Sequence, residues 1–186
     1  MKIKKPILLF SILILIANHS KAQSFNVGDK VGGIGIGIGG SYSVFNGASQ
    51  SPGFGIFYDQ GVTENVGPGV IGVGAYVGHK SFRRNYAGGY RQRLSYTIVG
   101  ARGTYHWQFH ELKELDTYAG LMLAMNFASY RDNSDNYPGL ITAHYGSYLS
   151  ATLFVGARYY FTPQVAAFAE VGYGIAYLTL GAAFKF

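Results

Sequence analysis

The 186-residue chain has no cysteine, 27 glycines and a formal net charge of +6. The missing cysteines exclude disulfides and thiolate metal sites, and the glycines, without a Gly-X-Y period, exclude collagen and favour many short turns and strands. Four of the 15 basic residues are lysines within residues 1–22, leaving 11 against nine acids, so the charge gives no reason to expect a nucleic-acid partner.

Residues 1–22 have the pattern of an export signal. Three lysines among the first five residues precede the apolar run ILLFSILILIA, and the small residues of SKA follow it. The run is too short to span a bilayer comfortably, which disfavours an uncleaved anchor. We therefore expect a cleaved signal peptide over 1–22, a short N-terminal segment over 23–29 and one domain over 30–186.

Beyond the signal, apolar residues alternate with small or polar ones at the period of two that is typical of strands. In VGGIGIGIGG, the isoleucines share one face and the glycines lie on the other. The same alternation predicts seven further strands, at 53–60, 70–80, 93–107, 117–130, 148–161, 165–172 and 176–186. We therefore predict an all-β domain of eight strands.

Eight antiparallel strands can close into an up-and-down barrel without exposed edges. A soluble, lipocalin-like barrel turns its apolar side chains inward, whereas a membrane barrel turns them outward. The two possibilities differ in the solvent that each face must meet. The composition of the less apolar face therefore has to decide between them.

That face carries too few charges for a surface in water. Its charges in the middle of strands are Asp59, Arg102, Arg158 and Glu170, with Lys80 and Lys185 near strand ends. The aliphatic face instead has aromatic residues near strand ends, as an interfacial girdle would: Tyr105, Trp107, Tyr159 and Phe161. The strands are also long enough for a tilted crossing of about 9 to 11 residues. We therefore predict a transmembrane β-barrel.

The chain ends on an apolar strand, TLGAAFKF. Thr179, Gly181, Phe184 and Phe186 match the polar-x-Gly-x-x-aromatic-x-aromatic pattern, which resembles the C-terminal signal that the outer-membrane assembly machinery recognises. With the export signal and the eight strands, the chain resembles the small outer-membrane barrels of Gram-negative bacteria, of the OmpX and OmpA-barrel type, over about residues 30–186.

The resemblance implies a place in the bacterial outer membrane, with both termini in the periplasm and the longer connections outside the cell. It implies membrane lipid and lipopolysaccharide as surroundings, and the barrel assembly machinery as a partner during biogenesis. We expect a monomer. The resemblance indicates the architecture far more specifically than the activity, because similar barrels serve many functions.

Four charges are predicted to meet inside the barrel. Arg158 and Glu170 lie on consecutive strands and become diagonal neighbours if Phe161 faces Val165. We predict that they form an ion pair, and that Arg102 and Asp59 extend the network across the lumen, because an isolated charge there would be costly. Such a network would plug the lumen as a structural element.

A second group of charges lies in a stretch that we expect to be an outer loop. It consists of Lys80, Arg83, Arg84, Arg91 and Arg93, without any acid among them. Guanidinium groups bind phosphate through paired hydrogen bonds, which favours the phosphates of neighbouring lipopolysaccharide as partner. A purely solvated loop is the alternative, and its place on the outer surface argues against nucleic acid.

No enzyme signature is present in usable form, and we expect no cofactor or metal. His79-Lys80-Ser81 is similar to the His-x-Ser of lipid A deacylase barrels, but the stretch that follows offers no glutamate. His106 and His110 have a spacing that binds metal only on a helix, and we expect them at the membrane interface. His144 has no ligand partner in view, and the GxGxxG spacing of the first strand lacks a following helix.

We therefore predict a structural or surface-interaction role, with outer loops touching lipopolysaccharide or an external surface. One alternative is a small porin-like passive channel, although eight strands enclose about one layer of side chains and little water. The other is a lipid-modifying enzyme, which would need a serine, a histidine and an acid converging at the outer rim.

Overall fold

The computed structural model describes residues 25–40, 49–86, 91–107, 112–132 and 146–186, so the predicted signal peptide lies outside the described residues. Within these ranges the strands are β1 (Lys30–Ile38), β2 (Ser49–Gln50), β3 (Gly53–Val66), β4 (Gly69–Asn85), β5 (Arg91–Trp107), β6 (Leu115–Asp132), β7 (Tyr148–Tyr160), β8 (Val165–Gly172) and β9 (Leu178–Lys185). No helix in the described ranges is long and apolar enough to cross a membrane.

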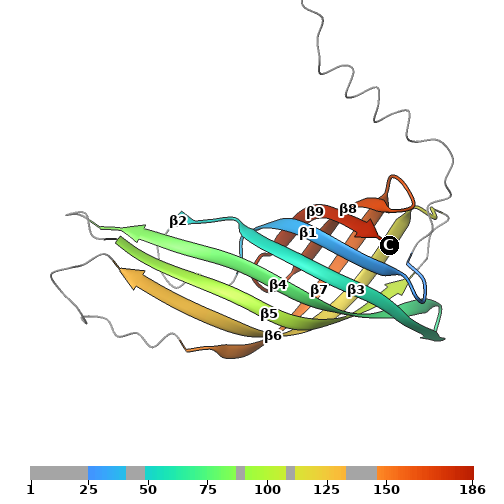
Figure 1. Ribbon diagram of the computed structural model, residues 1–186, viewed down its shortest axis with the longest axis horizontal. Coiled ribbons are helices and arrows are strands. Elements are labelled where there is room, and N and C mark those ends of the chain that lie inside the picture. The colour runs from blue at the N-terminus through green and yellow to red at the C-terminus, as the bar shows by residue number, and fades with distance from the viewer. Residues whose placement is uncertain (1–24, 41–48, 87–90, 108–111, 133–145) are drawn as a thin grey trace, which may run out of the picture.

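The sheet closes on itself into a barrel (Figure 1). Each of the eight longer strands pairs antiparallel with its neighbours in the chain, and β1 completes the circle by pairing with β9, Gly35 opposite Gly181. The two-residue β2 pairs only with β4, opposite Phe82 and Arg83. The predicted all-β, eight-stranded antiparallel barrel is therefore confirmed.

Several strands are longer than predicted. β4 continues to Asn85 and β5 begins at Arg91, so each strand takes up part of the stretch that was expected to be a loop. Together with β6 they extend past the ends of the neighbouring strands, away from the end that holds Lys30 and Phe186 (Figure 1). We call the end with these two residues the termini end, and the opposite one the distal end.

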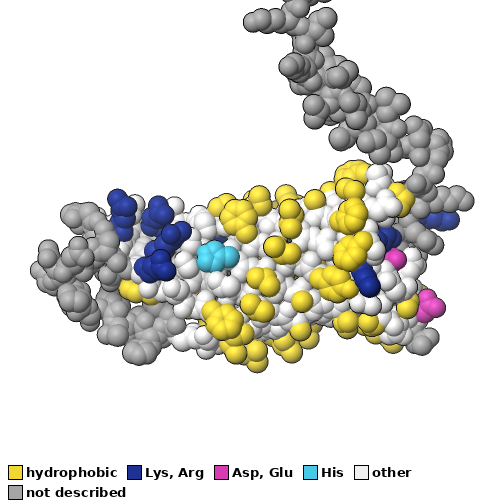
Figure 2. Space-filling model, in the orientation of Figure 1, with side chains coloured by type: hydrophobic (Ala, Val, Ile, Leu, Met, Phe, Trp, Pro, Cys, Tyr) yellow, Lys and Arg dark blue, Asp and Glu magenta, His cyan; other side chains and the backbone are white. Residues whose placement is uncertain are grey.

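The apolar side chains point outward. Ile36, Leu123 and Val155 expose 51%, 53% and 55% of their surface, although all three lie in the middle of strands. Figure 2 shows hydrophobic side chains over the middle of the face in view, and exposed large hydrophobic residues come from all eight longer strands, so they form a belt around the barrel. The inward-facing arrangement of a soluble barrel is therefore excluded.

Glycine makes room inside the barrel for aromatic rings. Four glycines lie side by side across four strands: Gly181, Gly35, Gly55 and Gly78. A Cβ atom at Gly35 would lie 2.8 Å from the Phe168 ring, and one at Gly78 would lie 2.7 Å from the Tyr76 ring. Both distances are too short for packed atoms, so these rings fit only because the glycines beside them carry no side chain.

Candidate functional sites: the enclosed charges and the arginine row

Asp59 of β3 is the centre of an ionic network inside the barrel. Its Oδ1 lies 3.0 Å from Nε of Arg102, and its other carboxylate oxygen forms an ion pair with Arg158. Asp59 and Arg158 are fully buried, and Arg102 exposes 4% of its surface. The single negative charge of Asp59 therefore balances part of the positive charge of two enclosed guanidinium groups.

Each arginine also has a second carboxylate. Arg102 Nη2 lies 2.6 Å from Glu170 Oε1, and Arg158 Nη1 lies 3.5 Å from Asp116 Oδ2. The hydroxyl of Tyr118 donates a hydrogen bond of 2.8 Å to the same Glu170 oxygen. The structure thus brings together all four residues that the sequence placed in the lumen, and adds Asp116.

The predicted pair between Arg158 and Glu170 is wrong. Asp116 lies directly opposite Arg158 in the register of β6 and β7, whereas Phe168 takes the corresponding position on β8 and Glu170 is only diagonal. Direct neighbours on one face lie closer than diagonal ones. Asp116 was missed because the strand was expected to begin one residue later, at 117.

Aromatic rings surround the two guanidinium groups. Arg102 Cζ lies 4.7 Å from the ring centre of Phe57 and 4.4 Å from that of Phe154. Arg158 Cζ lies 4.5 Å from Tyr118 and 5.0 Å from Phe57. These cation–π contacts offset part of the cost of removing the guanidinium groups from water.

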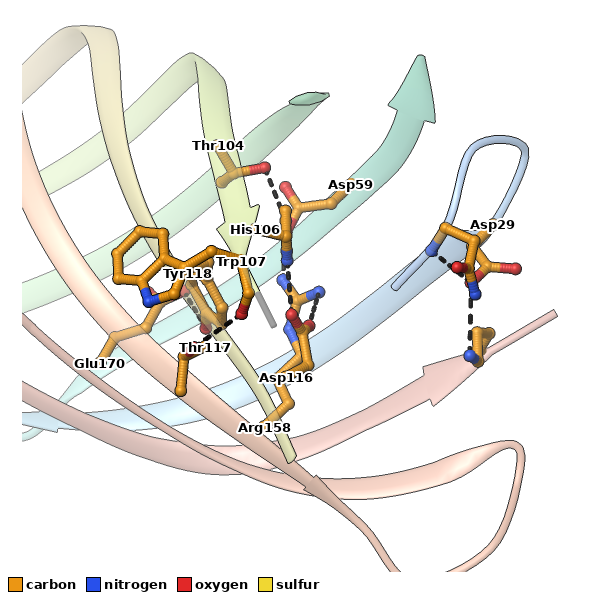
Figure 3. Close-up of polar contacts among 12 residues, drawn as sticks. Asp29, Asp59, Thr104, His106, Trp107, Asp116, Thr117, Tyr118, Arg158 and Glu170 are labelled. Atoms are coloured by element: carbon orange, nitrogen blue, oxygen red, sulfur yellow. Dashed lines mark hydrogen bonds and ion pairs between the residues drawn. The ribbon is translucent and has the colours of Figure 1, made fainter. Parts of the chain in front are cut away.

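His106 extends the network toward the termini end and does not lie at the membrane interface, as was expected; it is 2% exposed. Its Nδ1 lies 2.7 Å from Asp116 Oδ1, and its Nε2 lies 2.9 Å from Thr104 Oγ1 (Figure 3). The order Thr, His, Asp has the outline of a nucleophilic triad. Thr104 is 3% exposed, however, and the Phe25 ring stacks on His106 at 3.9 Å, so this hydroxyl is not open to a substrate.

Segments from both ends fill the barrel around this network. At the termini end, the buried Phe25 precedes β1, and Asp29 lies 3.3 Å from Lys185 of β9. At the distal end, the turn after β8 places Ile175 inside, with 6% of its surface exposed. A cavity of about 40 Å³ beside Glu170 has room for a few water molecules.

Lys80 does not belong to the outer basic group, contrary to the sequence-based expectation. Its side chain is 1% exposed and its ammonium donates hydrogen bonds to the carbonyl oxygens of Gly39 and Ile175, the latter at 3.4 Å. The alternation of β4 explains this, because Lys80 shares its inward face with Tyr76 and Gly78. It therefore helps to hold the inserted turn at the distal end.

The other basic residues of this group lie on strands rather than in a loop. Arg83 and Arg93 are exposed and directly opposite each other on β4 and β5, and Arg131 of β6 lies directly opposite Arg93. We call Arg83, Arg93 and Arg131 the arginine row. Among the side chains that the structure describes, no ion pair joins any of these arginines to an acid.

Arg84 and Arg91 have different surroundings. Arg84 is half-buried, and its guanidinium carbon lies 4.8 Å from the ring centre of Tyr86. Arg91 is exposed at the start of β5, opposite Asn85. Lys and Arg side chains gather at the distal end, beyond the hydrophobic belt (Figure 2).

The sequence did not predict Arg131 as a member of the arginine row, because the strand that carries it was expected to end at residue 130.

The C-terminal motif lies on β9 and just beyond it. Phe184 and Phe186 point outward, with 51% and 65% of their surface exposed, and the Phe186 amide donates a 2.9 Å hydrogen bond to the Lys30 carbonyl. Thr179 and Gly181 lie on the opposite face and are half-buried. The motif therefore presents its aromatic part to the exterior and its small and polar part to the lumen.

Among the described residues, no three His, Cys, Asp or Glu side chains are grouped so that they could hold a metal ion. His110 and His144 lie outside the described residues. His79 faces outward, where its Nδ1 lies 3.1 Å from Thr97 Oγ1. The His79-Lys80-Ser81 motif thus has its histidine outside the barrel and its lysine inside.

No protein-family model matches the sequence, and no curated protein matches it. Solved structures do match. One is Ail, the attachment invasion locus protein of Yersinia pestis, in complex with the heparin analogue sucrose octasulfate: the TM-score is 0.52 and the identity 14%, over 86% of this chain and 99% of Ail. The chain has the fold of a small outer-membrane β-barrel.

A second match is the N-terminal β-barrel domain of Pseudomonas aeruginosa OprF, with a TM-score of 0.48 and 16% identity, over 87% of this chain and 98% of that domain. The match to Ail, with its TM-score of 0.52, confirms at the level of the fold the resemblance to small eight-stranded outer-membrane barrels that the sequence predicted. Activity does not follow from fold, so the function must be argued from the two sites.

Proposed function

We propose that the protein is a monomeric barrel of the bacterial outer membrane with a structural or surface-interaction role, and that its arginine row contacts the phosphates of lipopolysaccharide. The observation that carries this proposal is the arginine row itself, three exposed guanidinium groups on adjacent strands just beyond an apolar belt. Like charges directly opposite each other destabilise a sheet. A bound anion removes this cost.

Phosphate suits these residues better than a carboxylate of another protein would. Guanidinium groups form paired hydrogen bonds with phosphate oxygens, and several of them can share one multiply charged group. Ail, which shares the fold, is seen in complex with a heparin analogue. A small barrel can therefore carry a site for a highly charged anion, which supports the proposal without identifying the ligand.

The test is retention of lipopolysaccharide by the purified barrel. We expect that changing Arg83, Arg93 and Arg131 together to Gln lowers the amount that co-purifies several-fold. The matched control changes Lys30 and Lys113, two exposed lysines at the termini end, to Gln and should leave retention unchanged. Equal retention by the wild type and the triple arginine variant would overturn the proposal.

The enclosed charges favour a lumen that is plugged by side chains. Asp59, Arg102 and Arg158 meet in the middle of the barrel and leave little exposed surface there. The alternative, a small passive channel, would need a continuous path for water past these groups. The enzymatic alternative would need an accessible nucleophile, and the buried Thr104 does not supply one. We therefore favour a non-enzymatic role.

The proposal includes the route by which the protein reaches its place. Residues 1–22 direct export and are cleaved, and both termini face the periplasm. The barrel assembly machinery recognises Thr179, Gly181, Phe184 and Phe186. This orientation is supported by the position of the arginine row, which then lies on the outer side of the membrane, where the phosphates of lipopolysaccharide are.

A further inference from the structure

The outward face of β4, β5 and β6 changes its chemistry in steps toward the distal end. Successive rows, each of three directly opposite residues, are Val77, Val99 and Met125; His79, Thr97 and Phe127; Ser81, Ser95 and Ser129; and Arg83, Arg93 and Arg131. The first row is apolar, the second is mixed, the third is entirely serine and the fourth is entirely arginine. We call the last two the serine row and the arginine row.

These rows have the spacing of the parts of one lipid molecule. Val77 and Arg83 are six residues apart on β4, about 20 Å along the strand, or about 14 Å along the barrel axis at a tilt near 45°. The apolar row contacts hydrocarbon, because Val77 and Val99 are half exposed, at 49% and 47%, on the belt. The arginine row then lies at the height of lipid headgroups, with hydroxyl groups between the two.

The arginine row is unfavourable without a ligand. Directly opposite side chains on neighbouring strands have Cβ atoms about 5 Å apart, so the charge of Arg93 is flanked on both sides by a like charge. No acid among the described side chains pairs with the row, and Ser49 of β2 is the next residue beside Arg83. A phosphate between two guanidinium groups would replace repulsion by attraction.

We propose that these rows form one binding site for a phosphorylated glycolipid, taken up as a whole molecule. The arginine row binds its phosphate, the serine row binds hydroxyl groups of its sugar, and an acyl chain lies against Val77, Val99 and Met125. The inference rests on the proposed contact with lipopolysaccharide and deepens it, because it assigns the sugar and acyl contacts and makes the lipid a stabilising ligand of the projecting sheet.

The test compares the wild type with Arg93→Gln and Ser95→Ala in an uncharged detergent, with and without the lipid A part of lipopolysaccharide. In detergent alone, Arg93→Gln should raise the unfolding midpoint, because it removes the repulsion. With lipid A, it should lower the affinity at least about ten-fold, since hydrogen bonds between charged groups contribute about 1.5 to 3 kcal/mol. Ser95→Ala should lower the affinity about two- to ten-fold.

Two further probes identify which part of the lipid is bound. Dephosphorylated lipid A should bind the wild type and Arg93→Gln equally, because the row then has no phosphate to contact. Inorganic phosphate should bind more weakly than lipid A, and Ser95→Ala should not change its affinity. Phosphate binding as strong as that of lipid A would overturn the glycolipid assignment and leave only an anion site.

The outcomes also separate this inference from the proposed function. If the triple arginine variant loses lipopolysaccharide but Ser95→Ala and Ser129→Ala bind lipid A like the wild type, the proposed function stands and this site is wrong. If the wild type binds no lipopolysaccharide, both fail. Ser129→Ala serves as a second variant of the serine row and should behave like Ser95→Ala, since Ser129 lies directly opposite Ser95.

Discussion

Asp59 of β3 forms ion pairs with two arginines, Arg102 of β5 and Arg158 of β7. Arg102 and Arg158 each also contact a second carboxylate, so the network remains connected across β3, β5, β6, β7 and β8. Groups enclosed in this way depend on each other, because a buried charge without a partner is far more costly than a pair. At the scale of the residue, the central carboxylate is therefore the most sensitive position.

We expect Asp59→Asn to lower the free energy of unfolding by about 3 to 5 kcal/mol, because it leaves two guanidinium groups under-compensated. The matched control is Asp29→Asn, which breaks the pair with Lys185 at the rim, where both side chains are partly exposed. This control should cost less than about 1 kcal/mol. The measurement is urea unfolding from lipid vesicles, and similar losses in the two variants would contradict a central role for Asp59.

Gly74 permits the close approach of β4 to the same carboxylate. A Cβ atom at Gly74 would lie 2.6 Å from Asp59 Oδ1 and would also overlap the Tyr58 carbonyl oxygen. We expect Gly74→Ala to cost about 1 to 3 kcal/mol. Gly103→Ala on the neighbouring strand should be neutral or slightly stabilising, because a Cβ there meets no atom within 4 Å. Thermal unfolding in detergent compares the two, and equal midpoints would count against this packing argument.

At the scale of the element, the strand ends at the two ends of the barrel carry different kinds of side chain. β4, β5 and β6 extend at the distal end and carry the arginine row, whereas β9 ends at the termini with two outward phenylalanines. The Phe184 and Phe186 rings stack at 6.3 Å, and Phe186 also lies 6.3 Å from Tyr58 of β3. Such exposed rings contribute little to packing, which leaves recognition during assembly as their proposed role.

We expect Phe186→Ala to reduce the amount of folded barrel in the outer membrane several-fold, while the purified protein keeps nearly the same unfolding midpoint. Its backbone hydrogen bond to Lys30 does not involve the ring and would remain. Phe161→Ala is the control, since this ring just after β7 is similarly exposed, 61% against 65%. Quantifying the folded protein in membrane fractions tests this, and equal losses would exclude a special role for the C-terminal ring.

At the scale of the whole molecule, closure of the sheet into a barrel separates the apolar outer surface from the charged interior. The apolar belt faces outward around the barrel, and the charges of the middle face inward and pair with one another. Phe25 from the termini end and Ile175 from the distal end fill the space on either side of them. An eight-stranded barrel leaves room for little beyond such side chains. The molecule as a whole is thus built as a closed cylinder.

We therefore expect the purified barrel to show no regular single-channel steps in a planar lipid bilayer, because ions would have to pass the buried network of Asp59, Arg102 and Arg158. Detergent added without protein gives the background. Reproducible steps of one size, present only with the folded protein, would favour the passive channel over the plugged barrel.

The sequence by itself determined the strands, their inward and outward faces and the closed membrane barrel. Alternation is a local property, and the number of charges on each face is fixed before any strand finds its partner. It also placed Asp59, Arg102, Arg158 and Glu170 on the enclosed face. It placed the ends of strands less well: Lys80 was assigned to an outer loop because β4 was predicted to end there, although the strand continues and its alternation turns Lys80 inward.

Only the tertiary structure decided which residues meet. Register brings Asp116, not Glu170, opposite Arg158, and it aligns Arg83, Arg93 and Arg131 in one row from three strands. A shift by a single residue would turn each of these side chains to the other face. Pairing between strands depends on contacts far apart in the chain, and these form only when the barrel closes.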